Sequence, residues 1–247
     1  MAAWAAYAGL LVIYVVVFSR SLGQTITLFL TDRQFVSIPA PGPDTYWAMA
    51  LPGWTVHAIL LTLTLLWLCI VTRVLRLRIG QVFAPDRDDT LMDARQRRVQ
   101  GWQVFTWAFV ALLVWLGGST LLEALLPTEA VGGFIIDDRA DAVWTSLMLG
   151  PAQVTTALVE EPIVVGLLVL VLTAARRPAW EIYTVAVVAK VAYHAYYGLP
   201  VLAMVPAALV IVWLYHRTGR LWPIIVAHAA YNLCFSALVI ALPHHLG

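Results

Sequence analysis

Residues 143–173 read VWTSLMLGPAQVTTALVEEPIVVGLLVLVLT, an apolar run of membrane-spanning length that contains two adjacent glutamates. A bilayer core about 30 Å thick needs about 20 apolar residues in a helix that crosses it. Other apolar runs of comparable character occur at about 2–18, 47–72, 101–122, 181–198, 201–216 and 221–242. The sequence therefore predicts an all-α fold, a polytopic transmembrane helix bundle with about seven spans.

The composition excludes several classes of protein. Of the 247 residues, 62% are apolar and 12% are charged, and the formal net charge is +1. A soluble domain has about 25% charged residues, so an ordinary soluble globule and a disordered chain are both excluded. A nucleic-acid-binding protein needs a basic surface, and this charge balance gives no sign of one. We therefore expect membrane lipid, and no nucleic acid, among the partners of this protein.

The arginines predict the orientation in the membrane. The chain has fourteen arginines and one lysine, and eleven arginines fall on one side of seven alternating spans. Seven of them lie in the linker 73–100, and the others are Arg176, Arg177, Arg217 and Arg220. Because cytoplasmic loops carry the excess of basic residues, we expect the N-terminus and this linker to be cytoplasmic. The preference for arginine over lysine is typical of a GC-rich genome, so we expect an integral protein of a bacterial cell membrane.

A small set of polar residues lies inside the predicted spans, where such residues are costly and tend to be functional. The set comprises Glu160, Glu161, His194, His228 and Asn232. At a rise of about 1.5 Å per helical residue, they lie roughly 12 to 24 Å from the nearest charge at the cytoplasmic end of their spans. This depth predicts one water-filled pocket inside the bilayer. We expect His57, in the second span, to form a helix–helix hydrogen bond outside this site.

Three motifs resemble those of the CPBP family, the CAAX proteases and bacteriocin-processing enzymes, also called Abi. The family's first motif is two glutamates, three residues and an arginine, and the chain has EEPIVVG at 160–166. The second is phenylalanine, three residues and histidine, and the chain has KVAYH at 190–194; the third, histidine, three residues and asparagine, is HAAYN at 228–232. The resemblance divides the chain into an N-terminal transmembrane region (1–145) with the arginine-rich linker and a CPBP-like protease core (146–242).

The resemblance implies an intramembrane, metal-independent glutamic endopeptidase that needs no cofactor. Its substrate would be a peptide bond of a membrane-associated or lipidated protein. Glu160 would be the general base, taking a proton from a water that it shares with His194. His228 and Asn232 would donate hydrogen bonds to the developing oxyanion, and Glu161 would support the site.

The chain departs from the family pattern at two positions. Val165 stands where the family has arginine, and Lys190 stands where the family has phenylalanine. An unpaired carboxylate or ammonium is costly inside a membrane. We therefore predict that Lys190 replaces the missing arginine and pairs with Glu161 across two spans. The alternative is that Lys190 extends to an interface or to water in the pocket.

Other functions fit the same residues. Two histidines and a glutamate can bind zinc with an open position, which would give a zinc-dependent version of the same peptidase. A non-catalytic membrane scaffold, an immunity protein, or a carrier that uses Glu160 and Glu161 as a proton relay are alternatives of another class. Convergence of the predicted site residues on one cavity favours catalysis over these alternatives. The sequence does not indicate an oligomeric state.

Overall fold

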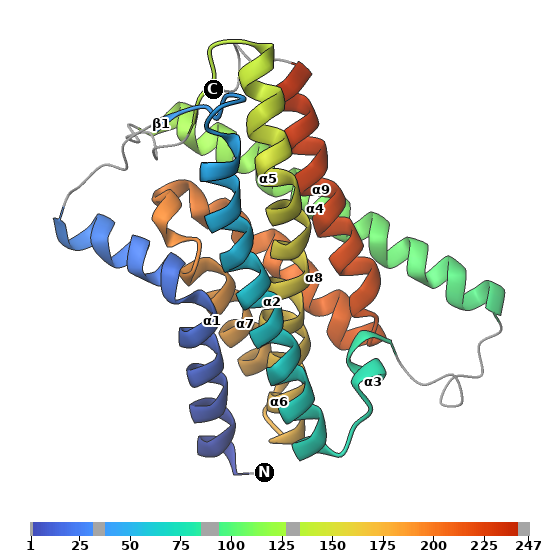
Figure 1. Cartoon of the computed structure of the whole chain (residues 1–247). Helices are drawn as coiled ribbons and strands as arrows, with labels where there is room; N and C mark the ends of the chain where they lie inside the picture. Colours follow the sequence, from blue (N-terminus) through green and yellow to red (C-terminus); the bar gives the residue numbers. More distant parts are fainter. Residues whose placement is uncertain (1, 32–37, 85–93, 127–133, 242–247) are drawn as a thin grey trace.

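The structure is a computed structural model that describes residues 2–31, 38–84, 94–126 and 134–241, and it is a bundle of helices (Figure 1). Six helical segments within these residues are long and apolar enough to cross a membrane. They cover Ala3–Leu28, Tyr46–Leu75, Ala94–Leu125, Arg139–Ala174, Leu199–Thr218 and Leu221–Ala241. Many large apolar side chains point outward from these helices, as expected where lipid is the solvent. The predicted all-α transmembrane bundle is confirmed.

The first helix, α1 (Ala3–Thr31), is longer than the predicted span 2–18. The sequence prediction ends this span before Arg20, whereas the helix continues past that residue. A kink at Phe18, whose angles are non-helical (φ −100°, ψ 15°), divides α1 into two parts. The second part swings away from the bundle in Figure 1. The kink changes the direction of the chain without ending the helix, so Arg20 lies in a helix and not in a loop.

The next helices frame the predicted cytoplasmic linker 73–100. Helix α2 (Tyr46–Leu75) ends at Arg76, whose left-handed backbone (φ 57°) caps the helix. The short α3 (Ile79–Phe83) follows, and α4 (Ala94–Leu125) includes the last residues of the linker. Residues 85–93 lie outside the described residues. The described ends of the linker are therefore largely helical.

The stretch with the two glutamates forms a central helical segment. It consists of α5 (Arg139–Glu160), the π-helix η1 (Glu161–Leu167) and α6 (Leu168–Ala174), and it is the most buried of the six candidate spans. Pro162 has no N–H and cannot donate the hydrogen bond that an α-helix requires at this point. The chain therefore passes into wider π-helical turns, which occur frequently at functional sites. The two glutamates lie where the helix type changes.

The predicted span 181–198 differs from the structure. Helix α7 (Ala179–Ala192) has 14 residues, and two 3-10 turns, η2 (Ala195–Tyr197) and η3 (Leu199–Ala203), follow it before α8 (Met204–Thr218) and α9 (Leu221–Ala241). Gly198 lies between the turns with φ 72° and ψ −155°, a conformation that favours glycine. Non-helical backbone at membrane depth needs protein or a water-filled cavity around it. The break in this span therefore points to the site of a cavity.

The start of α1 and the end of α9 lie at opposite ends of the bundle, as seven alternating spans predict. Figure 1 places the N-terminus, α3 and the end of α6 at one end. The end of α9 lies at the other end, with a short parallel pairing of β1 (Ile38–Pro39) and β2 (Phe134–Ile135). The arginine count predicts that the end with the N-terminus faces the cytoplasm.

Candidate active site

Four of the predicted site residues line one cavity of about 360 Å³. Glu160 is the last residue of α5, His194 follows α7, and His228 and Asn232 lie on α9. Their convergence on one cavity is the arrangement expected of a catalytic site. The fifth predicted residue, Glu161, is fully buried beside the cavity and hydrogen-bonds to one of its lining residues.

Glu160 has different surroundings at its two carboxylate oxygens. The hydroxyl of Tyr193 donates a hydrogen bond of 2.5 Å to Oε2. The Lys190 ammonium lies 4.0 Å from the same oxygen. The other oxygen, Oε1, lies 4.0 Å from Nε2 of His194. A protein donor therefore occupies Oε2, and Oε1 is the oxygen that faces the second predicted catalytic residue.

His194 is oriented by the backbone of α7. Its Nδ1 lies 2.9 Å from the carbonyl oxygen of Lys190. A carbonyl oxygen only accepts hydrogen bonds, so Nδ1 carries the hydrogen and, in the neutral ring, Nε2 is an acceptor. One water can bridge acceptors 4.0 Å apart with two hydrogen bonds of ordinary length. The geometry of Glu160 and His194 is therefore suited to hold one water molecule between Oε1 and Nε2.

Glu161 pairs with two cationic or potentially cationic groups. Lys190 donates to its Oε1 at 2.6 Å, and Nδ1 of His228 lies 2.7 Å from the same oxygen. Glu161 is 0% exposed and Lys190 is 2% exposed, so this is a buried ion pair. Its Oε2 has no hydrogen-bond partner within the described residues. The predicted pairing of Lys190 with Glu161 is confirmed in geometry, and Val165, at the family's arginine position, lies in the apolar core.

Asn232 is held by the helix that carries the glutamates. Its Nδ2 donates a hydrogen bond of 3.0 Å to the backbone oxygen of Gln153 in α5. An amide nitrogen has two hydrogens, so one hydrogen is not used in this bond. Because Asn232 also lines the cavity, its side chain is placed to donate toward a bound group.

His57 forms the helix–helix contact expected from the sequence. Its Nδ1 lies 3.0 Å from Oγ1 of Thr155, which joins α2 to α5. The prediction that His57 lies outside the site was wrong, because His57 lines the wall of the cavity.

The N-terminal region contributes to the site, although no motif in its sequence indicates this. Phe18 and Arg20 of α1 line the same cavity as Glu160. Tyr193 was also missed, although it directly precedes His194 in the second motif. A hydroxyl at the depth of the site was the available signal for Tyr193. No local pattern marks the α1 residues, because they approach the site only through the tertiary fold.

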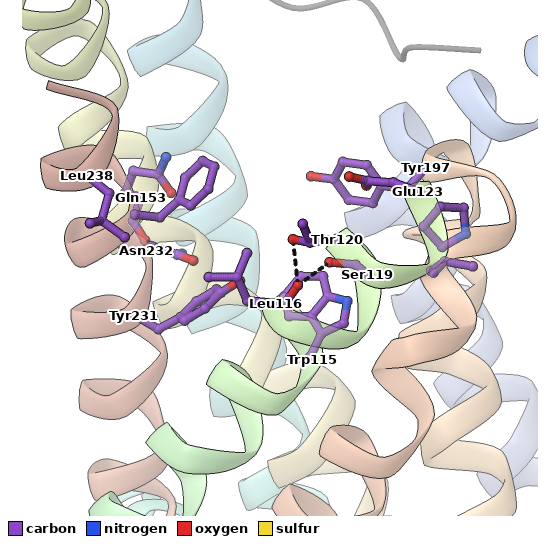
Figure 2. A pocket seen from close by; sticks show the side chains of 13 residues that line it. Trp115, Leu116, Ser119, Thr120, Glu123, Gln153, Tyr197, Tyr231, Asn232 and Leu238 are labelled. Atoms are coloured by element: carbon purple, nitrogen blue, oxygen red, sulfur yellow. Dashed lines mark hydrogen bonds between the residues drawn. The ribbon is translucent and has the colours of Figure 1, made fainter. Parts of the chain in front are cut away.

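A second cavity of about 620 Å³ adjoins the first. The residues that line both cavities are Trp115, Gln153, Tyr197 and Asn232. Figure 2 shows Gln153, Asn232 and Tyr231 on one side of the second cavity and Tyr197 with Glu123 on the other. This space extends from the candidate catalytic residues between α4 and α9, and its lining is mixed polar and apolar.

One cluster of ligand-type side chains within the described residues has the spacing of a metal site. Atoms of Glu160, Glu161 and His228 lie within 4.8 Å of one another. In the present geometry, Oε1 of Glu161 already accepts a hydrogen bond from Lys190 and lies 2.7 Å from Nδ1 of His228. A metal ion at that oxygen would have to displace a buried ammonium group. Oε1 therefore serves as a hydrogen-bond acceptor in this geometry, whereas Oε2 of Glu161 has no hydrogen-bond partner within the described residues.

Comparison with known proteins agrees with the motifs. Residues 142–234 match the model of a family described as type II CAAX prenyl endopeptidase Rce1-like, which belongs to the CPBP family. The predicted resemblance to this family is confirmed over the segment that runs from α5 into α9. At the family level the match supports a CAAX-protease-like hydrolase in a membrane. No curated protein and no solved structure matches the chain.

Proposed function

We propose that the protein is an intramembrane glutamic endopeptidase that hydrolyses a peptide bond by means of a water molecule activated by Glu160. The observation that carries this proposal is the 4.0 Å separation of Glu160 Oε1 and His194 Nε2 at the wall of a membrane-embedded cavity. The family match over 142–234 supports the same class of reaction. The reaction as proposed needs neither a metal ion nor a cofactor.

The first step is attack of the water on the substrate carbonyl. A water between Glu160 and His194 donates one hydrogen to Oε1 and the other to Nε2, which leaves a lone pair free for the carbonyl carbon. As the new C–O bond forms, the water proton moves to Glu160. When the C–N bond breaks, Glu160 returns this proton to the leaving amine, and the base is regenerated.

The developing oxyanion needs hydrogen-bond donors. Asn232 has an amide hydrogen that its bond to Gln153 does not use. Nδ1 of His228 lies 2.7 Å from the Glu161 carboxylate, and a protonated ring would donate from both nitrogens, one to Glu161 and the other to the oxyanion. Lys190 neutralises the charge that the second carboxylate brings into the membrane. In this scheme Glu161 acts through His228 and does not touch the substrate.

We infer that the substrate is a membrane-associated or lipidated protein. The cavity lies among the helices of a membrane bundle, and the second cavity extends it between α4 and α9. The family description names a prenyl endopeptidase. A suitable first probe is a quenched fluorescent peptide with a farnesylated cysteine followed by three residues, compared with the same peptide without the lipid.

The test uses the purified protein in bicelles. We expect cleavage of the lipidated peptide and a new carboxyl terminus in the mass spectrum. As a matched control, Glu181→Gln changes a glutamate in the first turn of α7, outside both cavities, and we expect it to cleave at the wild-type rate. Glu160→Gln cleaving as fast as wild type would contradict the role of Glu160 in the proposal, whereas no cleavage of either peptide by the wild-type protein would favour a non-catalytic scaffold.

A zinc-dependent peptidase is the second candidate, because Glu160, Glu161 and His228 have suitable spacing. The two candidates differ in their response to a chelator. Metal-independent hydrolysis is unaffected by prolonged treatment with a zinc chelator. Complete loss of activity, restored by added zinc alone, would favour the zinc-dependent peptidase.

A further inference from the structure

Helix α1 lies outside the segment that matches the family, yet it contacts the candidate base through one intermediate residue. The hydroxyl of Tyr14 donates a hydrogen bond of 2.7 Å to the backbone oxygen of Ala189 in α7. One turn further along α1, the ring of Phe18 stacks on the ring of Tyr193, with 4.1 Å between centroids and 14° between planes. These two contacts fix the first part of α1 against the end of α7.

Neighbouring aromatic rings pack against Tyr193. Phe18 stacks on it, and the His194 ring has its centroid 4.1 Å away, at 40°. Tyr14 makes an edge contact at 6.3 Å, and Tyr193 is 2% exposed. A phenol in such a packed position has little freedom to rotate. Its hydroxyl is therefore directed to a fixed point, which is Oε2 of Glu160 at 2.5 Å.

This hydrogen bond makes the two oxygens of Glu160 chemically different. Oε2 accepts from Tyr193, whereas Oε1 faces His194 across a gap that one water fits. A hydrogen bond to a carboxylate stabilises its ionised form, which is the form that accepts a proton from water. It also prevents rotation of the carboxylate, so the same oxygen always meets the water.

Building on the proposed function, we propose that Tyr193 is the positioning residue for Glu160 and that Phe18 of α1 holds Tyr193 in place. The N-terminal helix is then part of the catalytic apparatus, although no family motif lies within it. The kink at Phe18 fits this role, because its non-helical angles let the ring lie on Tyr193 while the rest of α1 turns away from the bundle.

The test removes the hydroxyl and the stacking ring separately. Tyr193→Phe keeps the ring between its neighbours and deletes the bond to Glu160. Phe18→Leu keeps an apolar side chain and deletes the stacking. Tyr215→Phe is the matched control, because it also removes a buried hydroxyl, which donates to the Val82 carbonyl at 3.0 Å away from both cavities. Each variant is assayed with the farnesylated peptide in bicelles and compared with Glu160→Gln.

For Tyr193→Phe we expect kcat to fall about 10- to 100-fold, the loss of one hydrogen bond to a charged group, with KM unchanged. The acid limb of the pH–rate profile should move to higher pH, because the ionised base has lost a stabilising donor. Phe18→Leu should lower kcat about 2- to 10-fold, the range for an aromatic pair. The double variant should be no slower than Tyr193→Phe, because Phe18 acts through that hydroxyl. Tyr215→Phe should keep the wild-type kcat and pH profile.

An infrared pH titration gives a readout that does not depend on turnover. The carboxyl band of Glu160 is identified by its loss in Glu160→Gln. We expect its midpoint to move to higher pH in Tyr193→Phe and to stay at the wild-type value in Tyr215→Phe.

The possible failures are distinguishable. Wild-type kcat, pH profile and infrared midpoint in Tyr193→Phe, with Glu160→Gln inactive, would overturn the positioning role and leave the proposed function intact. Full activity in Glu160→Gln would overturn the proposed function itself. Fully additive effects of Phe18→Leu and Tyr193→Phe would contradict the role given to Phe18.

Discussion

Replacing Lys190 with methionine tests the electrostatic arrangement of the buried site. The Lys190 ammonium lies 2.6 Å from Oε1 of Glu161, and both side chains are buried within the bundle. Methionine has a chain of similar length without the charge, so the substitution leaves Glu161 as a buried carboxylate with only His228 as partner. Breaking one partner of a buried ion pair costs about 3–5 kcal/mol. We expect Lys190→Met to lower the free energy of unfolding by about this amount.

The assay is reversible unfolding in mixed detergent micelles, read by circular dichroism, for the two single variants and the double variant. Lys190→Met and Glu161→Gln should each be strongly destabilising. The double variant should cost at least about 1 kcal/mol less than their sum, because the second substitution removes a charge that has already lost the other member of the pair. The control is Arg177→Met, which removes a partly buried ion pair with Glu181 at one end of α7 and should cost about 1 kcal/mol or less.

A rescue experiment tests the pairing of Lys190 with Glu161 in a second way. Lys190→Phe combined with Val165→Arg restores the family's residues at both positions. Position 165 lies four residues after Glu161, a spacing at which side chains on one helix face can meet. We expect the double substitution to be more stable than Lys190→Phe alone. Additive effects in the first cycle, together with no rescue here, would refute the pairing as the reason why this chain tolerates Val165.

Three further predictions concern other parts of the molecule. Gly166→Ala should destabilise the protein by about 1–3 kcal/mol in thermal denaturation, because the added Cβ would lie 2.9 Å from Leu221 Cδ2 and 3.3 Å from Val82 Cγ1. The control, Gly101→Ala, has open space around the added Cβ and should not be destabilising. Asn232→Ala should lower kcat about 10²- to 10³-fold with the farnesylated peptide, the effect of one oxyanion donor, and a loss confined to KM would contradict that role. In a chain whose two cysteines are replaced by serine, Arg95→Cys and Asp137→Cys should react with an impermeant thiol reagent from opposite sides of the membrane, and labelling from one side would refute the predicted orientation.

The site residues that are charged or polar could be predicted from the sequence, because such side chains are costly in lipid. Charged and polar side chains in apolar helices need partners, and this requirement alone brought Glu160, His194 and His228 together. The same argument predicted the pairing of Lys190 with Glu161, because each would be isolated without the other. The depth of each residue in its helix gave the first inference, and the second also needed the family pattern, in which Val165 stands at the arginine position.

The other features of the fold and the site depend on tertiary structure, which the sequence pattern does not describe. Hydropathy treats 181–198 as one span, because it does not register that α7 ends at Ala192 or that Gly198, between two 3-10 turns, takes a positive φ. Phe18 gives no local signal of its contact with Tyr193, which lies far along the chain and meets it only when α1 packs against α7. Arg20 appeared to end a span, whereas a kink lets the helix continue past it.

The most direct test of the central claim is the turnover of Glu160→Gln at equal amounts of folded protein. Glutamine keeps the size of the side chain and can still accept a hydrogen bond from Tyr193, but it does not take a proton from water at working pH. With the farnesylated peptide in bicelles, we expect kcat to fall by about 10²- to 10⁴-fold while the melting temperature stays close to that of the wild type. A Glu160→Gln protein that cleaves the peptide at the wild-type rate would contradict the claim that Glu160 is the catalytic base.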